Sequence, residues 1–153
     1  MTHNFKNFNP NQFQVAIMYS RVSLPLPPAS HVWFIINDHG TLSRYEGLDW
    51  RHRRSDGLDG YIFQDYFPPS VGLPVWILSK TPTWRAHTIS VIEGYGAERL
   101  AQVLYTSLHD YPHKHYRLLG PNSNTYARWV LDTAGLSDIK LPVTAVGAGF
   151  GKV

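Results

Sequence analysis

The sequence predicts an α+β fold in which a small antiparallel sheet packs on two or three helices. Strand-like runs dominate the first 92 residues, and two segments with helical periodicity follow them. A length of 153 residues favours one domain over 1–153, with residues 1–12 as a loosely ordered N-terminal extension. An apolar share of 43% and a charged share of 16% indicate a globular chain, because a disordered one would be poorer in apolar residues.

The first predicted strands lie on either side of a turn signal. Residues 13–19 alternate in polarity, and residues 31–37 are dense in β-branched and aromatic side chains. Asp38-His39-Gly40 then separates 31–37 from another strand-like run at 41–47. Residues 31–47 therefore predict a β-hairpin.

The middle of the chain is less regular. Residues 24–28 (LPLPP) predict an extended connector, because proline fixes φ and removes backbone donors. Residues 48–72 predict a long irregular excursion, and long loops in compact domains are often functional. Residues 73–79 and 84–92 predict two further strands, separated by a Thr-Pro turn.

Two helices are predicted in the last third. Residues 97–108 repeat apolar side chains at helical spacing. Residues 123–134 form the second amphipathic segment, with Gly135 suited to the C′ position. Residues 113–119 are either a short strand or an extended approach to the second helix, and the Gly-rich tail is predicted to be irregular.

Composition narrows the function classes. The absence of cysteine excludes disulfides, thiolate metal sites and a cysteine nucleophile. We see no signal peptide and no run of the ~20 apolar residues that span a bilayer. We therefore expect a soluble protein, cytoplasmic by default. The question whether an upstream targeting segment is missing stays open. The basic run 51–54 predicts a solvated loop, so a nucleic-acid partner is disfavoured. His113 and His115 alone make a poor metal signature, and no cofactor or metal is expected.

The stretch GPNSNT, residues 120–125, has more polar side chains than one helix start needs. Asn122 or Ser123 as N-cap would contribute about 1 kcal/mol over alanine. Asn124 and Thr125 are mediocre helix formers, so their presence in the first turn indicates a role other than helix formation. The positive end of a helix stabilises a deprotonated oxygen, and an activated serine there would act as a nucleophile.

Three interpretations of this stretch stay open. In the first, Ser123 is a nucleophile, His31 its base and Glu46 the group that orients the base. In the second, the same helix start binds a carboxylate, phosphate or peptide carbonyl without catalysis. In the third, the segment is purely structural and fastens the tail to the helix.

Several motifs resemble a bacterial domain-of-unknown-function family, DUF3750. They are HVWF at 31–34 with RYE at 44–46, Tyr111-Pro112, Tyr116, GPNSNTYARWVL, and LPVTAVGAGFGK. The resemblance covers residues 31–46 and 111–152. The chain departs from the family pattern at Gly-Ala-Gly-Phe-Gly, where family members have Gly-Lys-Asp.

A more distant similarity is to circularly permuted papain-like amidases and acyltransferases. Those enzymes place a histidine early on a hairpin, a polar residue on the next strand, and the nucleophilic cysteine late, at a helix start. The resemblance implies that His31, Glu46 and Ser123 take these places, with Ser123 in the cysteine position. It implies an amide or ester substrate that is small or peptide-like, and Asn122, Asn124 and Thr125 as substrate-binding residues. Serine is far less acidic than cysteine and depends on an adjacent base. Two interpretations are therefore open, an active serine variant and a non-catalytic binding module.

Overall fold

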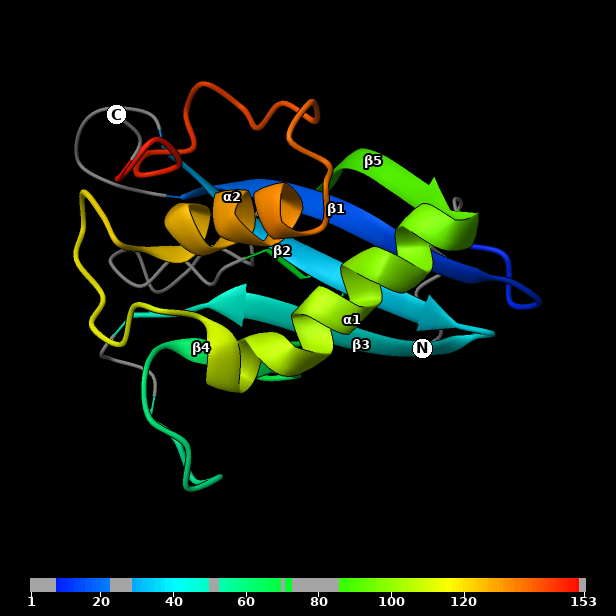
Figure 1. Ribbon diagram of the computed structural model, residues 1–153, viewed down its shortest axis with the longest axis horizontal. Helices are drawn as coiled ribbons and strands as arrows, with labels where there is room; N and C mark the ends of the chain where they lie inside the picture. The colour runs from blue at the N-terminus through cyan, green and yellow to red at the C-terminus, as the bar shows by residue number, and fades with distance from the viewer. Residues whose placement is uncertain (1–7, 23–28, 50–52, 70, 73–85, 152–153) are drawn as a thin grey trace, which may run out of the picture.

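The five strands form one antiparallel sheet with two helices on one side. The computed structural model describes residues 8–22, 29–49, 53–69, 71–72 and 86–151. The strands are Phe13–Val22 (β1), Ala29–Asp38 (β2), Thr41–Gly47 (β3), Ile62–Gln64 (β4) and His87–Glu93 (β5). Their order across the sheet is β4-β3-β2-β1-β5, and every neighbouring pair is antiparallel. The predicted α+β fold with a small antiparallel sheet is confirmed (Figure 1).

The predicted hairpin joins β2 to β3. Its loop has two residues, His39 with φ of 50° and Gly40 with φ of 99°. Positive φ at both central positions twists the turn in the sense that neighbouring strands require. The hairpin register pairs Phe34 with Tyr45 and Asp38 with Thr41.

Both helices lie on the same face of the sheet. The first, α1 (Gly94–Asp110), follows β5 directly, and α2 (Ser123–Thr133) ends where Gly135 takes a φ of 76°. Figure 1 shows both helices in front of the sheet. Apolar side chains of the two helices and of one strand face build the main core, which includes Ile17, Phe34, Leu100, Leu104, Tyr126, Val130 and Leu131.

The other face of the sheet carries a second, smaller buried cluster. It consists of Ala16, Met18, Trp33 and Ile35, with Val91 among the partly buried residues beside it. Successive side chains of a strand point to opposite faces, so odd-numbered residues of β2 lie on this side and even-numbered ones face the helices. The strands β1 and β2 are therefore buried on both faces.

Element boundaries differ from the sequence-based ones in a few places. The run 113–119 forms no strand, and its backbone instead makes turns before α2. The predicted excursion 48–72 contains β4, a three-residue edge strand that pairs with β3. The predicted strand at 73–79 and the connector at 24–28 lie outside the described residues. Among the helices that the structure describes, neither has the length and apolarity needed to cross a bilayer.

Candidate functional site

His31 on β2 and Glu46 on β3 meet in the interior. The His31 Nε2 atom lies 2.9 Å from Glu46 Oε1, and both side chains are buried. The His31 ring stacks on Trp33, with ring centroids 5.7 Å apart, which places it on the sheet face away from the helices. The two neighbouring strands thus bring together two residues that lie 15 positions apart in the chain.

Arg44 completes this buried group, and sequence reasoning did not single it out. Its guanidinium donates to both carboxylate oxygens of Glu46, with 2.7 Å between Nη2 and Oε1. It also donates to the carbonyls of Pro68 and Val71 and lies 4.3 Å over the Trp33 ring. The signal was present in the sequence, because residues two apart on a strand share a face and Arg44 precedes Glu46 by two.

Glu46 is ionised in this setting. Burial by itself raises the pKa of Glu46, but the charge of Arg44 and the hydrogen bonds from His31 and Arg44 lower it by more. The net pKa lies below the usual range, so the carboxylate is charged at neutral pH. A charged acceptor at Nε2 fixes the orientation of the His31 ring.

Asn122 is the N-cap of α2. Its side-chain oxygen accepts hydrogen bonds from the backbone N–H groups of Asn124 at 2.9 Å and Thr125 at 3.2 Å. In return, the Thr125 hydroxyl accepts from the Asn122 N–H at 3.0 Å, which closes a reciprocal capping box. The cap predicted at Asn122 or Ser123 is therefore Asn122, and Thr125 serves the cap as well.

Asn124 fastens the start of α2 to strand β2. Its side-chain oxygen accepts from the Val32 N–H at 3.1 Å, and its amide nitrogen donates to the Ser30 carbonyl at 2.8 Å. These two groups belong to the residues on either side of His31. The paired residues of β2 and β3 extend from Asp38 only to Phe34. At Ser30 and Val32, which lie beyond this pairing, the Asn124 side chain takes the place of a neighbouring strand.

The tail after α2 is tied to the same helix start. The Val146 carbonyl accepts from the side-chain amides of Asn122 at 2.9 Å and Asn124 at 3.0 Å. The Gly147 carbonyl accepts from the Thr125 hydroxyl at 2.7 Å. A Cβ at Gly147 would lie only 2.4 Å from the Asn122 amide nitrogen, so this close approach requires glycine. The side chains of three of the four polar residues are thus engaged within the protein.

Ser123 is the exception among the four. It is 5% exposed. Within the described part of the chain, neither its hydroxyl nor its backbone N–H makes a hydrogen bond. Among the described residues, the Ser20 hydroxyl is the one fully buried side-chain oxygen without a hydrogen-bond partner. The Ser123 hydroxyl also has no partner but is not fully buried in this sense, so it keeps some access to solvent. A hydroxyl and an N–H group are therefore uncommitted at the positive end of α2.

Ser123 lies against β3 beside Glu46. A Cβ added at Gly47 would sit 2.9 Å from the Ser123 Cα, so the two backbones touch. No hydrogen bond joins the Ser123 hydroxyl to His31 in the described part of the structure. His31 and Glu46 thus meet on the face away from the helices, whereas Ser123 approaches the same end of the β2–β3 pair from the helix side.

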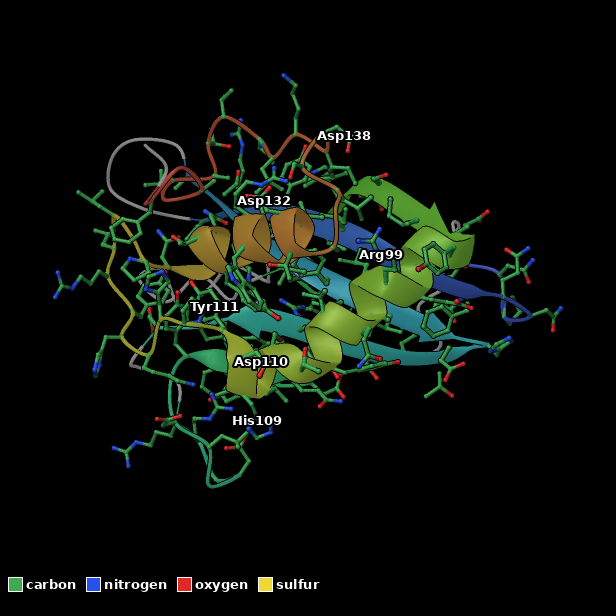
Figure 2. The ribbon with its side chains drawn as sticks, viewed as in Figure 1. Arg99, His109, Asp110, Tyr111, Asp132 and Asp138 are labelled. Atoms are coloured by element: carbon green, nitrogen blue, oxygen red, sulfur yellow. The ribbon has the colours of Figure 1, made fainter. Side chains whose placement is uncertain are left out.

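A buried tyrosine group supports the first turn of α2 from below. The Tyr61 hydroxyl bonds to that of Tyr111 and lies 3.3 Å from the Asn122 carbonyl. Figure 2 labels Tyr111, at the end of α1, next to α2. The Tyr111 ring packs edge-on against Tyr126 at 5.3 Å, and Ser107 of α1 bonds the Tyr126 hydroxyl at 2.8 Å. This support fixes the height of α2 above the sheet.

A family model described as a protein of unknown function (DUF3750) matches residues 12–150. No curated protein and no solved structure matches the chain.

Proposed function

We propose that this chain, which belongs to the DUF3750 family of proteins of unknown function, carries a hydrolase or acyltransferase site at the start of α2. Its substrate would be an amide or an ester, and Ser123 would be the nucleophile, in the place that a papain-like enzyme gives to cysteine. One observation carries the proposal. Three polar side chains hold the helix start in place, and Ser123 alone keeps its hydroxyl and its N–H uncommitted.

Each residue of the proposed site has a distinct role. The Ser123 hydroxyl attacks the substrate carbonyl carbon while its proton passes to His31. The bond between His31 Nε2 and Glu46 orients the ring for this transfer. The ionised Glu46 stabilises the imidazolium that forms. The Ser123 N–H and the helix dipole stabilise the oxyanion.

The remaining steps balance the reaction. The tetrahedral intermediate collapses, the bond to the leaving amine or alcohol breaks, and that group takes the proton from His31. Water, or another acceptor, then attacks the acyl-serine ester with His31 again taking a proton, and Ser123 is restored. His31 lies on the face away from the helices and Ser123 on the helix side, so the proposal requires a rearrangement that brings the two within about 2.6–3.2 Å in the substrate complex.

Labelling with a fluorophosphonate probe tests the nucleophile. We expect the wild-type chain to be labelled at Ser123, Ser123→Ala to lose the label, and His31→Gln to be labelled at least about tenfold more slowly, since general-base assistance contributes at least that much. Ser137→Ala is the matched control, because Ser137 is an exposed serine just after α2. Absence of label in the wild type, or equal label in Ser123→Ala, contradicts the proposed nucleophile.

The second candidate function is binding without catalysis. It is favoured by the absence of a hydrogen bond between Ser123 and His31 within the described residues, and by the weak acidity of serine. In that case the Ser123 N–H and hydroxyl would hold a carboxylate, phosphate or peptide carbonyl. Titration with acetate and with inorganic phosphate, followed by the NMR shift of the Ser123 amide, measures this directly. Saturable binding without fluorophosphonate label supports this second function.

A further inference from the structure

Two leucines occupy the tip of a tight turn just before α2. The Gly120 N–H donates to the Arg117 carbonyl at 3.0 Å, so Leu118 and Leu119 are the central residues of a β-turn. A second bond, from the Arg117 N–H to the Pro121 carbonyl at 2.7 Å, closes the turn at its base. Glycine, proline, asparagine, aspartate and serine dominate such positions, so a Leu-Leu tip is unusual.

The two leucines point into solvent. Leu118 is 62% exposed and Leu119 is 75% exposed. Phe150 of the tail is 45% exposed and lies against Gly120, the residue that follows Leu119, because a Cβ at Gly120 would be 2.8 Å from Phe150 Cβ. We call Leu118, Leu119 and Phe150 the apolar tip. Single exposed apolar residues need no explanation, but adjacent ones on a fixed turn mark an interaction surface.

The turn is held rigidly to the candidate site. The Asn122 side chain that caps α2 also donates to the Leu118 carbonyl at 2.9 Å. Ser123 is the next residue along. Figure 1 shows the segment before α2 and the tail gathered at the same end of the molecule as the start of α2, with the start of α1 at the other end. Whatever contacts the apolar tip therefore lies close to Ser123.

The chain segments on either side of the apolar tip lack acidic residues, although the neighbouring loop contributes Asp59. Residues 111–131 and 139–153 contain no aspartate or glutamate, but they include Lys114, Arg117 and Lys140. Lys114 pairs with Asp59 of the neighbouring loop at 3.4 Å, whereas Arg117 flanks the apolar tip directly and is exposed. Arg117 is thus the exposed cation next to the apolar tip, and exposed apolar side chains beside a cation suit insertion into an anionic membrane interface.

We propose that the apolar tip docks the protein onto an anionic lipid surface and brings the start of α2 to the interface. Leu118, Leu119 and Phe150 enter the acyl boundary, and Arg117 contacts the headgroup phosphates. If the proposed function also holds, on which this last step rests, the substrate is a lipid ester or amide presented at that interface.

Vesicle co-sedimentation of the full chain tests the docking. We expect binding to vesicles of phosphatidylcholine mixed with phosphatidylglycerol, and much weaker binding to phosphatidylcholine alone. The double variant Leu118→Ser/Leu119→Ser should bind at least about tenfold more weakly. Arg117→Gln should lose about fivefold, the loss that corresponds to one cation near the surface. Tyr95→Ser is the control, since Tyr95 is 74% exposed in the first turn of α1, at the other end.

Each result decides the proposal. Failure of the wild type to bind the anionic vesicles, equal binding to neutral vesicles, or an unchanged affinity of the leucine double variant would each overturn it. Because the assay needs no turnover, Ser123→Ala should bind vesicles as the wild type does. Loss of the fluorophosphonate result would then remove the proposed function alone, and loss of vesicle binding would remove the docking surface alone.

Discussion

The buried pair of Arg44 and Glu46 gives the sharpest stability prediction. The variant Glu46→Gln keeps the shape of the side chain but removes the charge that Arg44 faces in the interior. Arg44 and Glu46 are fully buried, and the guanidinium keeps only neutral carbonyl acceptors after the change. Breaking a buried pair by removing one partner typically costs about 3–5 kcal/mol. We expect a loss of that size in the free energy of unfolding, measured by urea denaturation at neutral pH with tryptophan fluorescence.

The chain provides a matched control for this change. Arg54 and Asp56 have the same spacing of two residues and the same two-bond contact, 3.1 Å and 2.9 Å, but Asp56 is exposed. Asp56→Asn should therefore leave stability nearly unchanged. If Glu46→Gln does not fold, Arg44→Met/Glu46→Gln should recover at least half of the loss, because it removes the unpaired charge. A loss for Glu46→Gln no larger than that for Asp56→Asn would refute the reasoning.

The same pair makes the free energy of unfolding depend on pH. The folded pKa of Glu46 lies below its unfolded value, so its contribution is complete above the unfolded pKa of about 4.3 and is lost as the pH falls through the folded pKa. Denaturation curves of the wild type should therefore converge with those of Glu46→Gln as the medium becomes acidic. A constant difference between the two across the acid range contradicts this linkage.

Three further changes have defined outcomes. Gly47→Ala should destabilise the fold by about 1–3 kcal/mol and abolish fluorophosphonate labelling at Ser123. The added Cβ would lie 2.9 Å from the Ser123 Cα and 3.0 Å from the Tyr61 ring. Normal labelling of this variant would count against the packing described. Asn124→Ala should cost about 2–3 kcal/mol in thermal or urea unfolding, since two buried hydrogen bonds and one partly buried one are lost. A loss under about 0.5 kcal/mol would be too small for that role. Burial raises the pKa values of Tyr45 and Tyr111 to about 12, so ultraviolet titration should show late ionisation, and stability should fall as the pH rises above the unfolded tyrosine pKa of about 10.

Local patterns explain which parts of the fold were predictable. The hairpin followed from Asp38-His39-Gly40, because positive φ at two successive turn residues is a property of the turn itself. The helix at 123–134 was predicted to within one residue, since its capping side chains and its C′ glycine are local signals. The three-residue strand β4 was missed, because so short an edge strand is specified by its partner β3 and not by its own sequence.

The candidate site was predictable only in part. His31 and Glu46 meet in a buried hydrogen bond, whereas Ser123 lies on the helix side of the sheet, so the three catalytic roles stay a prediction. Arg44 was within reach of sequence reasoning through its spacing from Glu46. The role of Asn124 was not, because its bonds to Ser30 and Val32 cross more than 90 residues and depend on where α2 lies against β2.

The ties between the tail and the first turn of α2 have a consequence for the order of folding during synthesis. The Val146 and Gly147 carbonyls accept three hydrogen bonds from the side chains of Asn122, Asn124 and Thr125. Both carbonyls follow every described strand and helix in the chain. A nascent chain can therefore assemble its sheet and both helices while these donors still lack their acceptors in the tail. The ties of this helix start to the tail can form only after residue 147 has left the ribosome, so the region around Ser123 cannot reach its final geometry before then.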